Sequence, residues 1–411
     1  MNSRERFQAC CQGKTLDRAP IDYLAHHELD RRLKAHLGVS SEIELLDALA
    51  CDFFYLPARD LSQREDFLPY YKRSHRLELT ETERTCPLGI RWRREVRAAK
   101  FSVDEAIRGP LQDTTDPQDV LRFPWPKAAD FDFGPLRAIA GSQRNRVRIG
   151  GFWTGILGDA YRMHGYQNFL TNLGAEPRFA HTLVDRLTEM YLELNDALFA
   201  ALKGELEVWF FGNDFGTQET LLMSRSMWRD FYFDNICRLT VLAHSHGLKV
   251  MMHSCGAVRP LIPLFVEAGV DILDPIQVSA KGMDLASLAA EFGDQVVFHG
   301  GIDTQRLLPH GSPDEVGEAV RAALQLFDGR GDYILAPSQI LGTDIPLDNV
   351  LAMYRAAAVQ SGCDGRQIEL EHHLAPFEKP VSGMALATGS GWDAIPAASA
   401  VPLTGHQTAS S

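Results

Sequence analysis

The stretch Lys249-Val-Met-Met-His253-Ser-Cys255-Gly256 places a short apolar run directly before a His-x-Cys pair and a glycine. Such a run is typical of a buried strand. Side chains alternate across a strand, so His253 and Cys255 face the same way at its carboxyl end. We therefore begin with this strand and ask what the rest of the chain builds around it.

Similar short runs recur along the chain, and longer segments with helical periodicity follow most of them. This alternation is typical of repeated βα units around a parallel sheet. Eight such strands predict a closed (β/α)8 barrel of the TIM type, in the α/β class, whose catalytic groups gather at the carboxyl ends of the strands. The eight candidates are Ala19–Leu24, Asp52–Leu56, Val147–Trp153, Val208–Gly212, Lys249–Ser254, Asp271–Ile276, Val296–Gly300 and Tyr333–Pro337.

Two segments depart from this pattern. The insert from Pro69 to Phe133 contains strand-like runs at Arg76–Thr80 and Gly89–Arg93 around a turn-like Cys86-Pro-Leu-Gly, which predicts a β-hairpin near the barrel mouth. Beyond residue 361, small and polar residues and proline dominate and bury too little surface to offset their ordering entropy. We expect one barrel domain over residues 1–361 and a flexible, disordered tail over 362–411.

Composition excludes several classes of protein. The chain has 411 residues and a formal net charge of −13, which disfavours nucleic acid as a partner because phosphate binding requires clustered cations. No apolar run approaches the roughly 20 residues of a membrane span. The start lacks the apolar core of a signal peptide, and seven cysteines at irregular spacing favour reduced thiols. We expect a cytoplasmic enzyme without nucleic-acid or membrane partners.

An imidazole and a thiolate side by side are two of the three protein ligands of a catalytic zinc site. His253 and Cys255 are therefore candidate metal ligands and catalytic residues, although a packed core pair is the alternative. The third ligand stays open from the residues alone. The last strand runs into Ser338, a poor zinc ligand, whereas Asp274 or Gln277 offers an oxygen at the end of the strand that follows His253.

A second polar cluster follows the fourth strand, in Gly212-Asn-Asp214-Phe215-Gly-Thr-Gln218. Asp214 is a candidate catalytic acid or base, and its alternative role is to cap the next helix. Because parallel strands end at the same edge, Asp214 is expected to meet the His-x-Cys pair. Phe215 and Gln218 in this loop are candidate substrate contacts.

Further candidate substrate contacts lie at other strand ends. Phe152 and Trp153 form either a ligand platform or simple barrel filling. His299 and Asp303 flank a Gly-Gly pair and form either polar walls of the site or a tight turn with a helix cap. Gln277 completes the set of candidate substrate contacts.

Taken in order, these motifs resemble the uroporphyrinogen decarboxylase superfamily over about residues 2 to 360. The superfamily also contains cobamide-dependent methyltransferases, such as methylcobalamin:coenzyme M methyltransferase. The resemblance rests on Ser3-Arg-Glu-Arg6 with Asp17-Arg-Ala-Pro20, Asp214-Phe-Gly216, His253-Ser-Cys-Gly256, Gly269-Val-Asp-Ile-Leu-Asp-Pro275, His299-Gly-Gly-Ile-Asp303 and Ala336-Pro-Ser338.

The methyltransferase branch is the more similar in motif. Its zinc is held by a His-x-Cys pair, which matches His253 and Cys255, and by a later Cys, where this chain has Ser338. The resemblance implies methyl transfer between a small substrate or acceptor and a cobamide carried on a separate corrinoid protein, with zinc in the barrel and a homodimer as the assembly.

The decarboxylase branch binds its carboxylated tetrapyrrole with an Arg-rich, Gly-containing loop after the first strand. Here that region retains only Arg31 and Arg32, so multiple carboxylates have few bidentate partners. Decarboxylation of a porphyrinogen or a smaller carboxylate remains the alternative function, and a non-catalytic binding barrel is the third.

Overall fold

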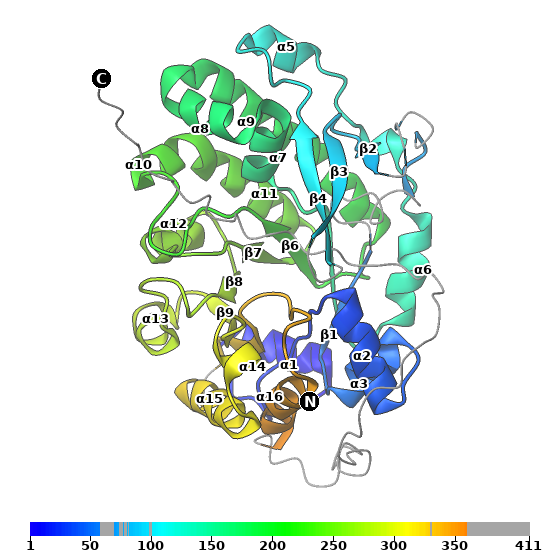
Figure 1. The fold of residues 1–411 in the computed structure, drawn as a ribbon, viewed down its shortest axis with the longest axis vertical. Coiled ribbons are helices and arrows are strands. Elements are labelled where there is room, and N and C mark those ends of the chain that lie inside the picture. The colour runs from blue at the N-terminus through cyan, green and yellow to red at the C-terminus, as the bar shows by residue number, and fades with distance from the viewer. Residues whose placement is uncertain are drawn as a thin grey trace, which may run out of the picture.

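The computed structural model describes residues 1–57, 70–73, 77, 80, 82–97, 101–328 and 331–359. Seven parallel strands form one curled sheet in the order β1-β5-β6-β7-β8-β9-β10, with helices outside the curl (Figure 1). The strands are β1 Phe53–Tyr55, β5 Val147–Gly150, β6 Val208–Gly212, β7 Lys249–His253, β8 Ile272–Ile276, β9 Val297–Ile302 and β10 Tyr333–Pro337. The parallel α/β architecture predicted from the alternation of runs is confirmed.

The helices form where apolar residues recur on one face. In α9 the stripe of Phe179, Leu183, Leu187, Met190 and Leu194 is buried. Among the helices that the structure describes, none is both long and apolar enough to cross a membrane. The helices are α1 Ser3–Cys10, α2 His27–Leu37, α3 Glu42–Ala48, α5 Pro117–Arg122, α6 Gly134–Ser142, α7 Ile156–His164, α8 Tyr166–Ala175, α9 Pro177–Ala201, α10 Arg225–Trp228, α11 Asp234–Ser245, α12 Ile262–Glu267, α13 Leu285–Phe292, α14 Leu307–His310, α15 Pro313–Leu326 and α16 Leu347–Val359.

The expected count of eight strands is corrected to seven, because the run at 19–24 forms only an isolated bridge. Ile21 pairs in parallel with Leu335 of β10. The amide of Asp22 donates to Leu335 O at 2.9 Å, and the amide of Asp52 donates to Ile21 O at 2.8 Å. Pro20 has no N–H to donate, so the pairing does not extend toward the amino end of this run. The segment nevertheless reaches β10 on one side and the residue before β1 on the other.

The predicted hairpin is a three-stranded antiparallel sheet of β2 Glu83–Thr85, β3 Arg91–Arg97 and β4 Phe101–Arg108. Its first turn lies where we expected it, because the amide of Gly89 donates to Cys86 O at 2.8 Å. The strand before that turn is β2, however, and not the run at 76–80, of which only two residues are described.

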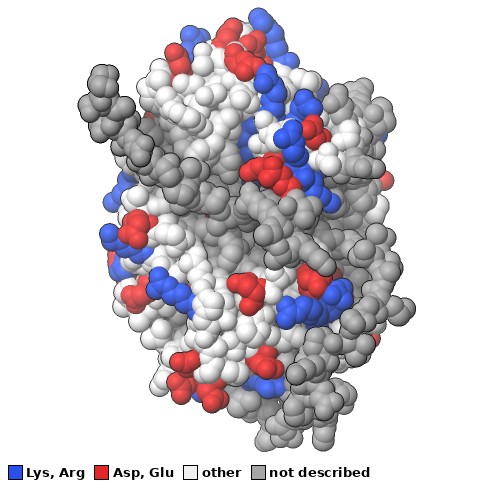
Figure 2. Space-filling view, viewed as in Figure 1, with Lys and Arg blue, Asp and Glu red and all other residues white. Residues whose placement is uncertain are grey.

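This small sheet lies against α7, which follows the carboxyl end of β5 (Figure 1). The guanidinium of Arg162 lies over the ring of Trp92, with 5.5 Å between its Cζ and the ring centroid. On the face drawn in Figure 2, Lys and Arg side chains gather over this sheet among Asp and Glu. Ion pairs of Arg91 and Arg93 with Glu83 are examples of that interleaving.

The concave face of the parallel sheet changes character along the strands. Near the amino ends, Met251, Ile272 and Val297 belong to a buried apolar cluster that includes side chains of α1. Two residues further along a strand, a side chain points to the same face. That step leads to His253, Asp274 and His299, so the apolar lining becomes polar toward the carboxyl ends. The predicted tail, 362–411, lies outside the described residues.

Candidate metal and catalytic site

Three potential ligand side chains meet at the carboxyl ends of β6 and β7. Asp214 follows β6, His253 is the last residue of β7, and Cys255 comes two residues later. One ligand atom of each lies within 4.8 Å of the other two. Nε2 of His253 is 3.2 Å from Sγ of Cys255 and 3.4 Å from Oδ1 of Asp214. The convergence that we expected from the barrel rule is therefore present.

These separations fit a divalent metal. Tetrahedral zinc bonds of about 2.3 Å to sulfur and about 2.0–2.2 Å to nitrogen and oxygen place ligand atoms about 3.4–3.6 Å apart. The measured 3.2 and 3.4 Å differ from that range by a few tenths of an ångström at most. One imidazole, one thiol and one carboxylate leave a fourth tetrahedral position for another ligand.

Two loops interlock to hold this geometry. The backbone amide of Cys255 donates to Oδ1 of Asp214 at 3.0 Å, and the amide of Phe215 donates to the Ser254 hydroxyl at 3.1 Å. Glycines let the loops approach. A Cβ on Gly256, whose φ is +92°, would lie 2.5 Å from the carbonyl carbon of Gly216. No larger residue fits at Gly256 without separating the loops.

Asp274 orients His253 and is not a third ligand. Its Oδ2 lies 2.6 Å from Nδ1 of His253, which leaves Nε2 turned toward Cys255 and Asp214. A carboxylate on the far nitrogen is the usual companion of a metal-binding histidine. The side chain of Gln277 is also engaged, because its Oε1 accepts from the amide of Gly256 at 2.7 Å. The carboxylate oxygen that lies near Nε2 of His253 and Sγ of Cys255 belongs to Asp214, which the sequence analysis did not consider as a ligand.

Electrostatics couple the three groups. Burial opposes a charge on His253, but the charge of Cys255 and hydrogen bonds to Asp214 and Asp274 raise its pKa well above the ordinary value. Burial raises the pKa of the Cys255 thiol to about 11, against the effect of His253. Burial alone would raise the pKa of Asp214, yet the hydrogen bond and charge of His253 lower it. Metal binding therefore has to displace protons from His253 and Cys255.

Of the predicted aromatic contacts, Trp153 reaches the site. Its ring centroid is 5.4 Å from that of His253. Phe152 packs instead among helix-side aromatic residues, with its ring 5.3 Å from Phe131. Phe215 is fully buried against Trp228 and other rings on the same side of the sheet. Phe152 and Phe215 are therefore core residues and do not line the site.

Two other predicted contacts have local roles in the structure. Gln218 is exposed, and its carbonyl accepts from the amide of Lys281 at 2.9 Å. Oδ1 of Asp303 accepts from the amides of Gln305 and Arg306 at 2.7 and 3.3 Å, which is the turn geometry that we considered as its alternative.

Sequence reasoning missed several polar residues behind the site. His299, expected as a substrate contact, is 2% exposed. Its Nδ1 lies 2.6 Å from Asp274, and its Nε2 lies 2.9 Å from Asp22. The hydroxyl of Tyr55 donates to the same Asp22 carboxylate at 2.6 Å. An acidic residue inside an apolar strand-like run was the available signal for Asp22.

The end of β10 contributes an amide. Nε2 of Gln339 donates to Sγ of Cys255 at 3.0 Å, while its Oε1 accepts from the amide of Ile340 and so fixes the orientation of the side chain. Ser338, at the position where the resemblance implies a Cys, is buried. Its hydroxyl has no hydrogen-bond partner among the described residues.

Comparisons with known proteins show the family and the fold of the chain. A family model described as uroporphyrinogen decarboxylase (URO-D) matches residues 114–359, a stretch that includes every residue of the Asp214, His253 and Cys255 triad. None of the curated proteins matches the sequence.

Among solved structures, a methyltransferase from Methanosarcina mazei is similar at a TM-score of 0.63 and 16% identity, covering 88% of this chain and 99% of that one. D-psicose 3-epimerase from Clostridium cellulolyticum H10, with D-tagatose, has a TM-score of 0.34 and 12% identity, covering 58% of this chain and 85% of its own. A 3-keto-D-glucoside 4-epimerase from E. coli has a TM-score of 0.29 and 14% identity, covering 53% of this chain and 100% of that one. The methyltransferase likeness shows a shared fold.

Proposed function

Because the chain belongs to the uroporphyrinogen decarboxylase family, we propose that it is a metal-dependent methyltransferase of that family. It moves a methyl group between a small substrate or acceptor and a cobamide carried by a separate corrinoid protein. The observation that carries the proposal is the triad of Asp214, His253 and Cys255, whose ligand atoms lie within 4.8 Å of one another.

The metal that we propose is zinc, held by these three side chains. When bound, zinc would lower the pKa of a thiol or water in the open position and so make it a nucleophile near neutral pH. A mixed sulfur, nitrogen and oxygen donor set suits zinc better than magnesium or calcium, which prefer oxygen ligands alone.

Three residues around the triad have roles in this proposal. Asp274 keeps Nε2 of His253 facing the metal, through the 2.6 Å contact at Nδ1. Gln339 donates a hydrogen bond to the sulfur of Cys255, which stabilises negative charge on it. Trp153 covers the ring of His253 and provides an apolar wall for a methyl group.

Access to the site favours a substrate or cofactor that arrives from the strand ends. The side chain of Asp214 is 30% exposed, compared with 12% for His253. The reactive position therefore lies toward solvent, on the side from which a corrinoid protein would present its cofactor. The partner itself is part of the proposal.

Decarboxylation is the alternative activity within the family. The two arginines retained from the decarboxylase-like loop are engaged elsewhere: Arg31 pairs with Glu28 at 2.7 Å and is 71% exposed, and Arg32 donates to Thr343 O at 3.0 Å. Two guanidinium groups are few bidentate partners for the several carboxylates of a porphyrinogen, which favours the methyltransferase proposal.

The test begins with the metal content of the purified wild type, Cys255→Ser and Cys237→Ser. Cys237 is a partly exposed cysteine of α11 and serves as the matched control. We expect about one zinc per chain in the wild type and in the Cys237→Ser variant, and a loss of most of it in Cys255→Ser, since serine is a poor zinc ligand.

The same three proteins are then mixed with methylcobalamin and a thiol, and demethylation is followed by its absorbance change. The proposal predicts turnover in the wild type and the control, and none in Cys255→Ser. The proposal would be contradicted if the wild type contained no metal, did not turn over methylcobalamin, and released CO2 from uroporphyrinogen. That result would support the decarboxylase alternative.

A further inference from the structure

Behind His253, Asp274 begins a continuous row of buried polar side chains whose further members, His299, Asp22 and Tyr55, have no part in the methyl-transfer proposal. Asp274 contacts His253 through Oδ2 and His299 through Oδ1, both at 2.6 Å. The other nitrogen of His299 is 2.9 Å from Asp22, which accepts from the Tyr55 hydroxyl at 2.6 Å. Asp22, His299 and Asp274 are 1%, 2% and 5% exposed.

The contacts define the charge of His299. Both of its ring nitrogens face carboxylate oxygens, which only accept hydrogen bonds, so both must carry a hydrogen. Asp22 also accepts from the backbone amide of Tyr23 at 2.8 Å, so an amide, a hydroxyl and an imidazole all donate to this carboxylate. His299 is thus an imidazolium between two carboxylates. Although burial opposes it, the charge of Asp274 and the bond to Asp22 raise the pKa of His299 to about 9.

Charged side chains in this row are not needed to fill the core. Burying an ion pair seldom adds more stability than apolar side chains of similar volume would. Two residues earlier on β8 and β9, the same face is filled by Ile272 and Val297. A charged row at this place therefore calls for a reason beyond the filling of the core.

We propose that His299 is a positioning residue: anchored by Asp22, it orients the Asp274 carboxylate so that its second oxygen holds His253 with Nε2 toward the metal. This inference rests on the proposed metal site. Without His299, Asp274 is free to rotate, and the direction of Nε2 is no longer defined. Partners behind a metal ligand typically contribute 10–100-fold to metal affinity.

The test is a double-mutant cycle on zinc affinity, measured by competition with a chromophoric chelator on metal-depleted protein. The cycle comprises the wild type, His299→Gln, Asp274→Asn and the double variant. We expect His299→Gln to bind zinc about 10–100-fold more weakly. Because His299 acts through Asp274, the double variant should bind no more weakly than Asp274→Asn alone.

A buried histidine elsewhere supplies the matched control. Nδ1 of His164 lies 2.7 Å from Leu111 O, and its Nε2 lies 2.9 Å from Asn172, so His164→Gln disturbs an equally buried ring without touching the row. Its zinc affinity should equal that of the wild type. Should His299→Gln fail to fold, Asp22→Asn replaces it in the cycle, because it removes the anchoring charge and keeps the shape.

Zinc affinity unchanged by His299→Gln, or losses that add in the double variant, would overturn the inference and leave the metal site intact. If the wild type binds no zinc, the metal proposal fails, and NMR of metal-free protein labelled with 15N-histidine decides the inference. A low-field Nδ1–H signal of His253 that is lost or displaced in His299→Gln supports it. An unchanged signal overturns it.

Discussion

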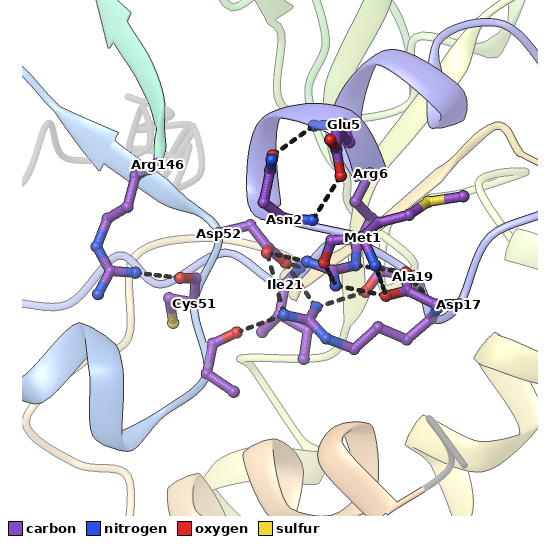
Figure 3. Close-up of polar contacts among 12 residues, drawn as sticks. Met1, Asn2, Glu5, Arg6, Asp17, Ala19, Ile21, Cys51, Asp52 and Arg146 are labelled. Atoms are coloured by element: carbon purple, nitrogen blue, oxygen red, sulfur yellow. Dashed lines mark hydrogen bonds and ion pairs between the residues drawn. The ribbon is translucent and has the colours of Figure 1, made fainter. Parts of the chain in front are cut away.

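The two ends of the parallel sheet carry polar residues of different kinds. At the amino ends, fully charged pairs dominate. Figure 3 shows the pair of Asp52, just before β1, with Arg6, and Asp52 also bonds Arg18; each contact is 2.6 Å. Arg148 of β5 pairs with Glu205 and Glu207 in the same way. Each guanidinium there has a carboxylate partner, and nothing in these pairs is arranged to hold a further ligand.

At the carboxyl ends, the polar groups are imidazoles, a thiol, carboxylates and an amide. Nε2 of His253, Sγ of Cys255 and Oδ1 of Asp214 face one another without an arginine or lysine bonded to any of them in the described chain. Such an arrangement suits the cation that we propose for this site, whereas the charged pairs at the amino ends contribute to the stability of the fold. The division agrees with the general separation of catalysis and stability between the two faces of a barrel.

The largest effect on stability is expected at the amino ends. Asp52→Asn leaves the buried guanidinium of Arg6 and the partly buried one of Arg18 without their shared carboxylate, which should lower the free energy of unfolding by about 3–5 kcal/mol. Urea unfolding measures it, and zinc per folded chain should not change. The control Glu28→Gln, which breaks an exposed pair with Arg31, should cost about 0.5 kcal/mol or less. Equal losses of unfolding free energy in the two variants would mean that the pairs at the amino ends stabilise the fold no more than an exposed pair does.

The converse change is Asp214→Asn at the carboxyl ends. Asparagine keeps an oxygen for the amide of Cys255, so the free energy of unfolding of the metal-free protein should change by about 1 kcal/mol or less. Zinc affinity, measured by chelator competition, should fall by about 100-fold or more, since a lost ligand costs more than a lost partner behind one. Wild-type affinity or unchanged turnover in this variant would remove Asp214 from the site.

Gly256, directly after Cys255, allows a test of stability and metal binding together. Gly256→Ala places a Cβ 2.5 Å from the carbonyl carbon of Gly216 at a φ of +92°, so the loops must separate. We expect a stability loss of about 1–3 kcal/mol together with weaker zinc binding. Gly174→Ala in α8 meets no atom within 4 Å and should stabilise by about 0.5–1 kcal/mol with zinc binding unaltered. Weaker zinc binding in both variants would refute the assignment.

A smaller effect depends on pH. Burial alone would raise the pKa of Asp17, but hydrogen bonds from Arg6 lower it below its ordinary value. The folded pKa is then below the unfolded one, so Asp17 stabilises the protein above about pH 4 and loses this contribution as the pH falls through its folded pKa. The stability gap between wild type and Asp17→Asn, about 1–2 kcal/mol at pH 7, should narrow toward pH 2. If the free energies of unfolding of the two proteins kept the same difference from pH 7 to pH 2, this role of Asp17 would be contradicted.

Much of the fold and part of the site followed from local patterns. Seven apolar runs became strands, and the rule that parallel strands end at one edge brought Asp214, His253 and Cys255 together. The eighth run did not form a strand: it pairs with β10 only through the isolated bridge of Ile21 with Leu335, and Pro20 lacks the N–H that would extend this pairing toward the amino end.

One error at the site came from a neighbour on the adjacent strand, which the sequence of a single strand does not reveal. Asp274 lies opposite His253 in the β7–β8 register, so it bonds the imidazole and not the metal position. Phe152 was placed wrongly for another reason. Alternation counted from Val147 puts Ile149 and Trp153 on one face of the sheet and Phe152 on the other, and the structure keeps this order: Trp153 packs against the cluster of Val147 and Ile149, whereas Phe152 belongs to the other cluster.

X-ray absorption at the zinc edge of zinc-loaded protein tests the assignment of the triad most directly. A site held by Asp214, His253 and Cys255 predicts one sulfur at about 2.3 Å and the remaining ligands, nitrogen and oxygen, at about 2.0–2.2 Å. A shell with two or more sulfurs, or with none, would contradict the account.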